Sequence, residues 1–378
     1  MRCRFFPFSI LMVSAFIVSL FILFAIALPA QRSTINTVPF RIDSLFQELH
    51  AQGKFNGNVL VARDNEIVYS KVFGYADFEH KKPLTIQSIF EVGSITKQFT
   101  AIVVMMLYEN GKLDLNDPVK VYIPEFPYEG ITIHHLLTHR SGLPEYMRFA
   151  KKYWKNKKQV MTNKDLLNIL IKYRPALLFS PDEDYYYSNT GYALLASVIE
   201  RISGLKYSNF LENKIFKTLD MNNTFVFRKQ KAKYYNNIAF GYDLRQCRVR
   251  EDYLCGIVGD KGIYSSVEDL LKWDNALYSE KLVKQETLAK AFTPYSYDKN
   301  NDRYYGYGWR IAEINGCKIF YHAGQWNGYN SLILRRHYDK STIIILSNKR
   351  DSVYEELDVL VSMLDSKDGT VGAKSNGF

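Results

Sequence analysis

Helical spacing of apolar residues marks four parts of the chain. In residues 41–53 an apolar face is followed by Gly53, which ends the pattern. Directly after Ser94, apolar residues recur at helical intervals up to the stop signal Gly111; they are Phe99, Ile102, Val103, Met106 and Leu107. The same spacing predicts a strong helix over residues 189–204 and a last helix over residues 352–366.

Alternation of apolar and polar residues predicts strands near both ends of the chain. Residues 57–63 and 66–76 are joined by Asp64-Asn65, which is typical of a β-hairpin. Four short runs with turn residues between them return much later; they span residues 305–314, 317–324, 329–336 and 341–348. From residue 112 to about 250 the patterns are mostly helical, with long polar loops.

This order of elements predicts an α+β fold. We expect one antiparallel sheet built from both termini and flanked by two terminal helices, with a mostly helical region inserted between them. The whole unit spans residues 40–366, after a linker at 31–39, and residues 367–378 have the composition of a disordered tail.

The N-terminus carries an export signal. Arg2 and Arg4 precede a run from Phe5 to Ala30 that contains no charged residue. Ala25-Ile26-Ala27 fits a cleavage site, whereas the length of the run also suits a membrane anchor over residues 5–28. Residues 1–30 are therefore either a signal peptide or an anchor. Both place residues 31–378 outside the cytoplasm, in the periplasm or at the cell surface.

Charge and cysteine content narrow the functional classes. The net charge of +10 comes from scattered Lys and Arg, which favours a solvated basic face over attraction to anionic cell-surface polymers. No zinc-finger or RNA-binding signature accompanies this charge, so we expect no nucleic-acid partner. Cys247 and Cys255 are close enough in sequence to pair in an oxidising compartment, which would leave Cys317 alone.

Candidate chemistry begins with the pattern Ser-x-x-Lys, which occurs three times: Ser94/Lys97, Ser203/Lys206 and Ser296/Lys299. Only Ser94 and Lys97 stand at the start of a strong helix, where positions i and i+3 project to one side. A serine there is either an ordinary helix cap or a nucleophile beside its base. A lysine in the first turn is unfavourable for the helix dipole, which weighs against the cap.

A lysine is mostly protonated in water at neutral pH, so a second group that relays the proton would help it act as a base. Tyr187-Ser188-Asn189 lies in a turn immediately before the helix over residues 189–204, and a phenol there can reach a cleft. The identical tripeptide at Tyr207 instead begins the next helix. His322-Ala323-Gly324 ends a predicted strand, where small residues let a ligand approach the backbone.

In this order, these motifs resemble those of the serine β-lactamase and penicillin-binding protein family, on the side of class C β-lactamases and D-alanyl-D-alanine carboxypeptidases. The resemblance covers roughly residues 40–365; its pieces are "FEVGSITKQFTA", "LDLNDPVKVYIPEFP", "ITIHHLLTHRSGLPEY", "FSPDEDYYYSNTGYALLASVIERISG", "GDKGIYSSVEDLLKWDNAL" and "YHAGQWNGYNS". The resemblance implies a β-lactamase/transpeptidase-like fold.

It also implies a role for each motif residue. Ser94 would form an acyl-enzyme, with Lys97 and Tyr187 sharing the base and acid roles. Asn189 would orient the substrate amide and Lys97. His322 would take the place of the lysine common in the third motif. Gly324 would leave room for the substrate beside the strand, and the N–H groups of Ser94 and Gln325 would form an oxyanion hole.

Two positions depart from the family pattern. Asp182 stands where a glycine is usual, and Ala323 replaces a Thr or Ser whose hydroxyl binds the carboxylate of penicillins. Its loss removes a hydrogen bond to a charged group, worth roughly 1.5–3 kcal/mol. We therefore expect esterase, amidase or D-amino-acid peptidase activity rather than efficient β-lactam hydrolysis. The alternative is a non-catalytic penicillin-binding or cell-wall sensor module.

The expected partner is a small molecule or a peptidoglycan-like peptide, with no cofactor. His135 and His139 are four residues apart and could share a helix face as metal ligands, but no Glu follows His135, so the zinc-protease motif fails. No Gly-x-Ser-x-Gly occurs, which argues against an α/β-hydrolase.

Overall fold

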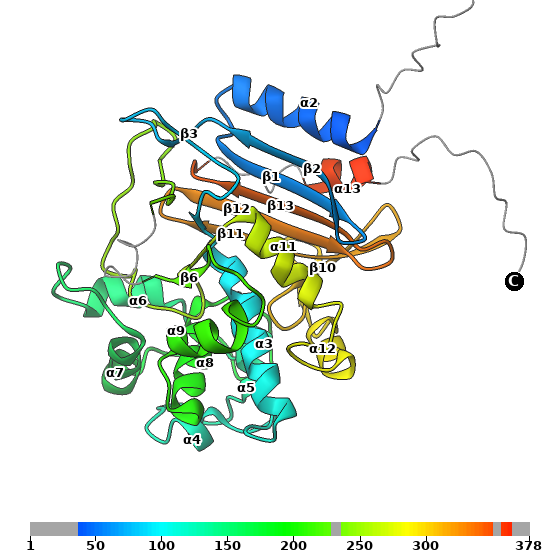
Figure 1. Ribbon diagram of the computed structural model, residues 1–378. Helices are drawn as coiled ribbons and strands as arrows, with labels where there is room; N and C mark the ends of the chain where they lie inside the picture. Colours follow the sequence, from blue (N-terminus) through cyan, green and yellow to red (C-terminus); the bar gives the residue numbers. More distant parts are fainter. Residues whose placement is uncertain (1–36, 228–235, 351–356, 365–378) are drawn as a thin grey trace, which may run out of the picture.

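The computed structural model describes residues 37–227, 236–350 and 357–364 (Figure 1). The apolar segment 1–30, most of the expected linker and the expected tail lie outside these residues, as do the first five and the last two residues of the predicted last helix. Among the described helices, none combines the length and apolar character needed to cross a membrane.

The centre of the molecule is an eight-stranded antiparallel sheet built from both ends of the chain, which confirms the predicted α+β architecture. Its strands, in spatial order, are β2 (Glu66–Phe73), β1 (Gly57–Arg63), β13 (Ser341–Ser347), β12 (Tyr329–Arg336), β11 (Cys317–Trp326), β10 (Arg310–Ile314), β9 (Arg303–Tyr305) and β8 (Ser296–Asp298). Asp64 and Asn65, with φ of 48° and 68°, form the predicted hairpin turn between β1 and β2.

Two helices cover one face of this sheet (Figure 1). They are α2 (Val38–Ala51) and α13 (Leu357–Leu364), the predicted terminal helices. Their apolar stripes, which include Ile42, Phe46 and Leu360, share one buried cluster with side chains of β1, β11, β12 and β13. The first helix begins at Val38, before the predicted start, so the end of the expected linker is helical.

The inserted helical region covers the opposite face (Figure 1). Its helices are α3 (Thr96–Glu109), α4 (Val119–Tyr122), α5 (Ile133–Leu137), α6 (Tyr146–Tyr153), α7 (Asn163–Tyr173), α8 (Asn189–Ser203), α9 (Tyr207–Leu211), α11 (Val267–Ala276) and α12 (Gln285–Ala291), with a 3₁₀ turn η1 (Gly93–Ile95) and a π-helical turn η2 (Glu212–Phe216). The central helix is α3, buried on nearly all sides. It packs on α11 through Phe99 and Trp273, whose rings stack 3.9 Å apart.

Two small sheets complete the fold. One has the order β5 (Phe90–Glu91), β7 (Ile263–Ser265), β6 (Phe225–Val226), and the other pairs β3 (Tyr75–Asp77) with β4 (Lys82–Pro83). Because β5 leads directly into η1 and α3, the three-stranded sheet fixes the entry of the chain into the Ser94 turn.

Two expectations about strands and cysteines need correction. The strand that carries His322 does not end at Gly324: β11 continues to Trp326, because the turn into β12 is made by Asn327 and Gly328. The disulfide considered for Cys247 and Cys255 is not formed, because both thiols are free in the described part of the chain.

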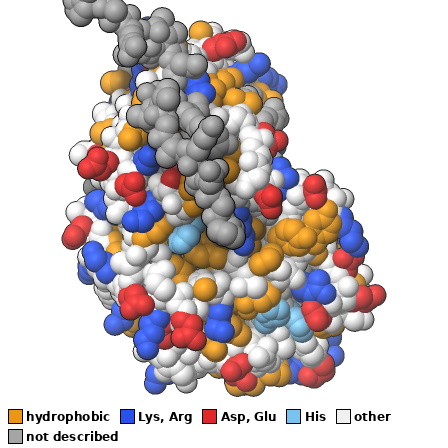
Figure 2. Space-filling view, turned by 90° about the vertical axis from the view of Figure 1, so that its right-hand side faces the viewer, with side chains coloured by type: hydrophobic (Ala, Val, Ile, Leu, Met, Phe, Trp, Pro, Cys, Tyr) orange, Lys and Arg blue, Asp and Glu red, His pale blue; other side chains and the backbone are white. Residues whose placement is uncertain are grey.

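The net positive charge does not gather on the face shown in Figure 2. Basic and acidic side chains are interspersed there, with apolar groups between them. This distribution agrees with a solvated surface on that side of the molecule.

Candidate active site

Ser94 lies in the short turn η1, half-exposed, between β5 and α3. It is not a helix cap: the residue before α3 is Ile95, and Ser94 makes no capping hydrogen bond. Gly93 before it has a φ of 51°, and a Cβ there would lie 2.8 Å from the main-chain nitrogen of Gln325. Only glycine allows the turn to approach β11 this closely.

Lys97 is fully buried and makes three hydrogen bonds. Its Nζ donates to Ser94 Oγ at 3.0 Å, to Asn189 Oδ1 at 2.7 Å and to the main-chain oxygen of Asp260 at 2.9 Å. The last two acceptors carry no hydrogen, so they always take an N–H from the lysine. The third direction on Nζ points at Ser94, whose hydroxyl can donate as well as accept.

Glu145 fixes the orientation of Asn189. Its half-buried carboxylate accepts hydrogen bonds from the main-chain N–H of Asn189 at 2.9 Å and from Asn189 Nδ2 at 3.0 Å. Because the amide nitrogen is committed to this carboxylate, Oδ1 is turned toward Lys97. Burial raises the pKa of Glu145, while its hydrogen bonds from Asn189 and Met147 oppose the shift.

Tyr187 lies beside the same lysine. The centre of its ring is 5.0 Å from Lys97 Nζ, and its other side rests on His139 with ring centres 4.3 Å apart. His139 accepts a hydrogen bond from the Ser188 N–H on Nδ1, so Nε2 carries the proton. That Nε2 is buried without a hydrogen-bond partner within the described ranges.

His322 and Gln325 come from β11, where it extends beyond its neighbour β10. His322 is buried, with Nε2 3.1 Å from the Tyr305 hydroxyl and Nδ1 2.7 Å from the Ala323 carbonyl oxygen. Ala323 points to the other face of the sheet, where it packs against the cluster under α2 and α13. Gly324 faces the Ser94 turn, and a Cβ on it would lie 2.1 Å from the Val92 oxygen.

The hairpin turn determines where the Gln325 N–H points. In a two-residue turn such as Asn327-Gly328, the flanking pair Trp326 and Tyr329 exchanges hydrogen bonds. The next pair, Gln325 and Asn330, then turns its N–H and C=O groups away from the partner strand. The Gln325 N–H therefore faces the free edge of β11, next to Gly93 and the nitrogen of Ser94.

The structure thus brings together all seven residues named as candidates from the sequence. The other Ser-x-x-Lys matches are separated. Ser203 Oγ bonds to Ile199 within α8, whereas Lys206 precedes α9. Ser296 Oγ bonds to Thr138, and Lys299 lies on the surface near Asp184.

The departure at Asp182 has a local explanation. Its φ of 69° lies in the left-handed region, where glycine is favoured. Arg140 compensates: its side chain pairs with the Asp182 carboxylate at 2.5 Å, and the Asp182 N–H donates to the Arg140 oxygen at 2.8 Å. The aspartate thus keeps the turn that leads to Tyr187.

Sequence reasoning missed Glu145, and it considered His139 only as a metal ligand. Glu145 caps α6 through the Met147 N–H, and a carboxylate just before a helix was the available signal. His135 instead closes a capping box with Thr132, so the two histidines do not share a site. The described residues contain no group of three or more His, Cys, Asp or Glu placed to hold a metal ion.

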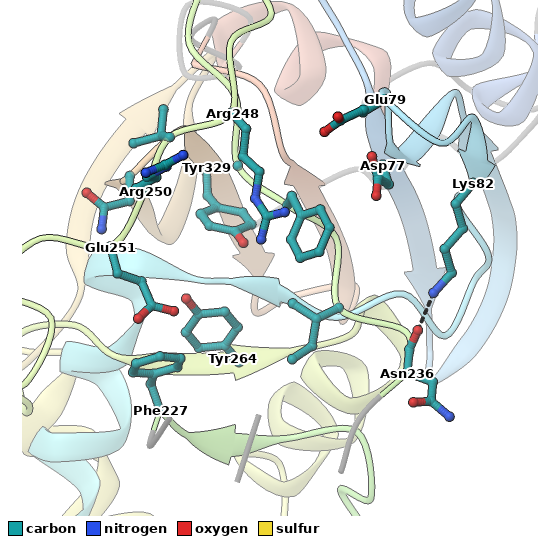
Figure 3. Close-up of a pocket in the computed structure, with 15 residues that line it drawn as sticks. Asp77, Glu79, Lys82, Phe227, Asn236, Arg248, Arg250, Glu251, Tyr264 and Tyr329 are labelled. Atoms are coloured by element: carbon teal, nitrogen blue, oxygen red, sulfur yellow. Dashed lines mark hydrogen bonds between the residues drawn. The ribbon is translucent and has the colours of Figure 1, made fainter. Parts of the chain in front are cut away.

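A cavity of about 940 Å³ lies nearby but does not contain the catalytic candidates. Figure 3 shows Tyr264 and Tyr329 on one side of it, with Arg248 between them and Asp77. Tyr264 separates this cavity from Glu91, to which its hydroxyl donates at 3.0 Å. None of Ser94, Lys97 and Tyr187 lines it, so this cavity does not mark the site.

The two buried histidines predict a loss of stability in acid. Burial lowers the pKa of His139 and of His322 well below 6.5, and the nearby Lys97 and Arg310 add to the shift. Below pH 6.5 the unfolded chain binds protons that the folded chain does not, so the free energy of unfolding falls as pH falls.

We expect up to ~1.4 kcal/mol per histidine per pH unit in that window. Urea unfolding of wild type and His322→Gln between pH 7 and 5 measures it, and the variant should lose less stability. His80→Gln is the control, because His80 is exposed and Asp77 raises its pKa. Parallel curves for wild type and His322→Gln would contradict the prediction.

Comparisons with known proteins identify the family of this chain. A family model described as beta-lactamase matches residues 42–361. Penicillin-binding protein 4* of Bacillus subtilis (strain 168) is 37% identical over 330 residues, covering 83% of this chain and 73% of that protein. The octameric penicillin-binding protein homologue from Pyrococcus abyssi superposes with a TM-score of 0.77 at 31% identity, covering 86% and 76%.

The D-amino acid amidase from Ochrobactrum anthropi SV3 shares the fold at 22% identity, with a TM-score of 0.72 over 86% of this chain and 98% of that one. Since the family model spans most of the chain and a relative at 37% identity spans 83% of it, the protein belongs to the family of serine β-lactamases and penicillin-binding proteins, which are serine hydrolases and their relatives.

Proposed function

We propose that this protein hydrolyses an ester, an amide or a D-amino-acid peptide through an acyl-enzyme on Ser94. The observation that carries the proposal is the position of the buried Lys97. Its Nζ is bound to two oxygen atoms that can only accept hydrogen bonds, Asn189 Oδ1 and the Asp260 main-chain oxygen, and its remaining position faces Ser94 Oγ at 3.0 Å. When Lys97 is neutral, its two N–H groups bond to Asn189 and Asp260, and its lone pair faces the serine hydroxyl.

The remaining groups support the steps that follow. As Ser94 attacks the carbonyl carbon, its proton passes to Lys97. The N–H groups of Ser94 and Gln325 face the position where negative charge develops on the carbonyl oxygen. Tyr187, beside Lys97, donates its phenolic proton to the leaving group and takes up the serine proton from Lys97, and water then hydrolyses the acyl-enzyme by the reverse proton path.

The substrate class follows from what surrounds these groups. His322 is neutral near pH 7 because burial lowers its pKa, so it supplies no positive charge for the carboxylate of a penicillin. We therefore expect slower turnover of a penicillin-like carboxylate than of simple esters or D-amino-acid peptides. We also propose that the protein acts outside the cytoplasm, on the basis of Arg2, Arg4 and the apolar run 5–30.

A substrate panel tests the proposed function. Hydrolysis of p-nitrophenyl esters, D-amino-acid peptides and nitrocefin is measured with wild type, Ser94→Ala and the matched control Ser203→Ala. We expect turnover of an ester or peptide that is lost in Ser94→Ala and kept in Ser203→Ala. A lasting penicillin adduct without turnover of any member would instead favour the non-catalytic binding module.

Glu145 provides a second test within the site. Replacing it by alanine frees the Asn189 amide to rotate away from Lys97, so we expect turnover to fall roughly 10–100-fold. Glu129→Ala is the control, because Glu129 is exposed and forms a surface ion pair with Lys120. Wild-type turnover in a folded Glu145→Ala protein would show that the carboxylate does not position the site.

A further inference from the structure

A second buried lysine lies next to the site and takes no part in the steps above. Lys261 is 3% exposed and directly follows Asp260, whose main-chain oxygen accepts a hydrogen bond from Lys97. An ammonium group is costly to bury unless it is paired and hydrogen-bonded. The contacts of Lys261 therefore indicate what it holds in place.

Those contacts join the segment that carries Lys261 to Tyr146 of α6 and to Trp326 of β11. Lys261 Nζ donates to the Tyr146 hydroxyl at 2.8 Å and to the Ile257 oxygen at 3.1 Å, and it lies 3.8 Å from Asp260 Oδ1. The Tyr146 hydroxyl in turn donates to Asp260 Oδ2 at 2.9 Å. On its other side, Lys261 Nζ lies 4.7 Å from the ring centre of Trp326.

Two of these parts, residues 257–261 and β11, each supply a group to the site. The segment from Ile257 to Lys261 carries the carbonyl that receives Lys97, and Thr100 of α3 holds the same segment through the Gly259 oxygen at 2.6 Å. Trp326 is the residue after Gln325 in β11. Lys261 thus connects the segment whose Asp260 oxygen holds Lys97 with the end of β11 that faces the Ser94 turn.

The carboxylate paired with Lys261 belongs to Asp260. Asp260 is its closest carboxylate, and Asp260 Oδ1 has no hydrogen-bond partner within the described ranges. Burial raises the pKa of Glu91 to about 8, so this carboxyl is mostly protonated near neutral pH. Tyr146 and the Cys255 thiol, two further titratable groups that interact with Lys261, are also neutral because burial raises their pKa values. Removing Lys261 would therefore leave the Asp260 carboxylate uncompensated beside Lys97.

We propose that Lys261 is a positioning residue: it ties the Asp260 carbonyl that holds Lys97 to the β11 end that carries Gln325. This inference rests on the proposed acylation of Ser94. It predicts two effects of removing the ammonium. First, Lys97 and the Gln325 N–H are no longer held at a fixed distance from each other. Second, the uncompensated charge of Asp260 favours the protonated form of Lys97.

The experiment measures the second-order rate of Ser94 labelling by a fluorophosphonate between pH 6 and 10. Lys261→Met is compared with wild type and with Lys272→Met, whose lysine is partly exposed on α11 and paired with Asp269. We expect Lys261→Met to label on the order of 10²-fold more slowly. Its half-maximal rate should also move to higher pH, whereas Lys272→Met should match wild type.

A purely structural role for Lys261 would lower the melting temperature without moving the pH profile. Tyr146→Phe keeps the lysine but removes the hydroxyl that joins it to Asp260, and we expect about tenfold slower labelling. If Lys261→Met does not fold, the labelling rate and pH profile of Tyr146→Phe decide whether the inference holds. A wild-type rate and pH profile in the folded Lys261→Met, or in Tyr146→Phe, would overturn the inference. Absence of labelling in wild type would overturn the proposed function itself.

Discussion

Replacing Lys97 by methionine is expected to slow the acylation of Ser94 by roughly 10²–10⁴-fold, the range typical of a lost general base. Methionine has a similar length but neither accepts the serine proton nor bonds to Asn189 and the Asp260 oxygen. Labelling with a fluorophosphonate, followed by intact mass over time, measures the rate.

Lys206→Met is the matched control, since Lys206 belongs to another Ser-x-x-Lys match and lies on the surface before α9. It should label at the wild-type rate. If Lys97→Met labels as fast as wild type while Ser94 remains the modified residue, Lys97 is not the base and Tyr187 would have to act alone.

The largest stability effect is expected at a buried ion pair between α11 and the sheet. Arg335 of β12 lies 3.3 Å from Asp274 of α11, and both side chains are at most 2% exposed. Thr342 donates to the other carboxylate oxygen at 2.5 Å, and the guanidinium stacks 4.2 Å from the ring centre of Tyr278. Asp274→Asn leaves this guanidinium buried without its anion.

We therefore expect Asp274→Asn to lower the free energy of unfolding by about 3–5 kcal/mol, measured by urea denaturation. The double variant Asp274→Leu/Arg335→Met should recover most of that loss, because no unpaired charge remains. The exposed pair Arg201–Glu125 serves as control, and Arg201→Met should cost less than about 1 kcal/mol. If Asp274→Asn also lowered the free energy of unfolding by less than about 1 kcal/mol, the prediction would be contradicted.

Periodicity was sufficient to predict most of the fold. The hairpin at Asp64-Asn65, the helices after Ser94 and at Asn189, and the sheet built from both termini all follow from local patterns. The end of β11 did not follow from a local pattern. Ala323 and Gly324 have the composition of a strand end, whereas the turn at Asn327-Gly328, with positive φ at both residues, determines the true boundary.

The site was only partly predictable, for a related reason. Ser94, Lys97, Tyr187 and Asn189 lie at helix starts, where spacing carries information. Glu145 acts across 44 residues on Asn189, and Lys261 acts through Tyr146 and Trp326, contacts that no local pattern encodes. His139 stands at a φ of 59° beneath Tyr187, so the backbone conformation, rather than a helix face, directs it to the site.

The most direct test of the central claim is the intact mass of the protein after treatment with a fluorophosphonate or a labelled penicillin. We expect one adduct per chain on wild type and on Ser203→Ala, located at Ser94 by peptide mapping, and none on Ser94→Ala. Absence of any adduct on wild type, or an adduct that survives Ser94→Ala, would contradict the assignment of Ser94 as the nucleophile.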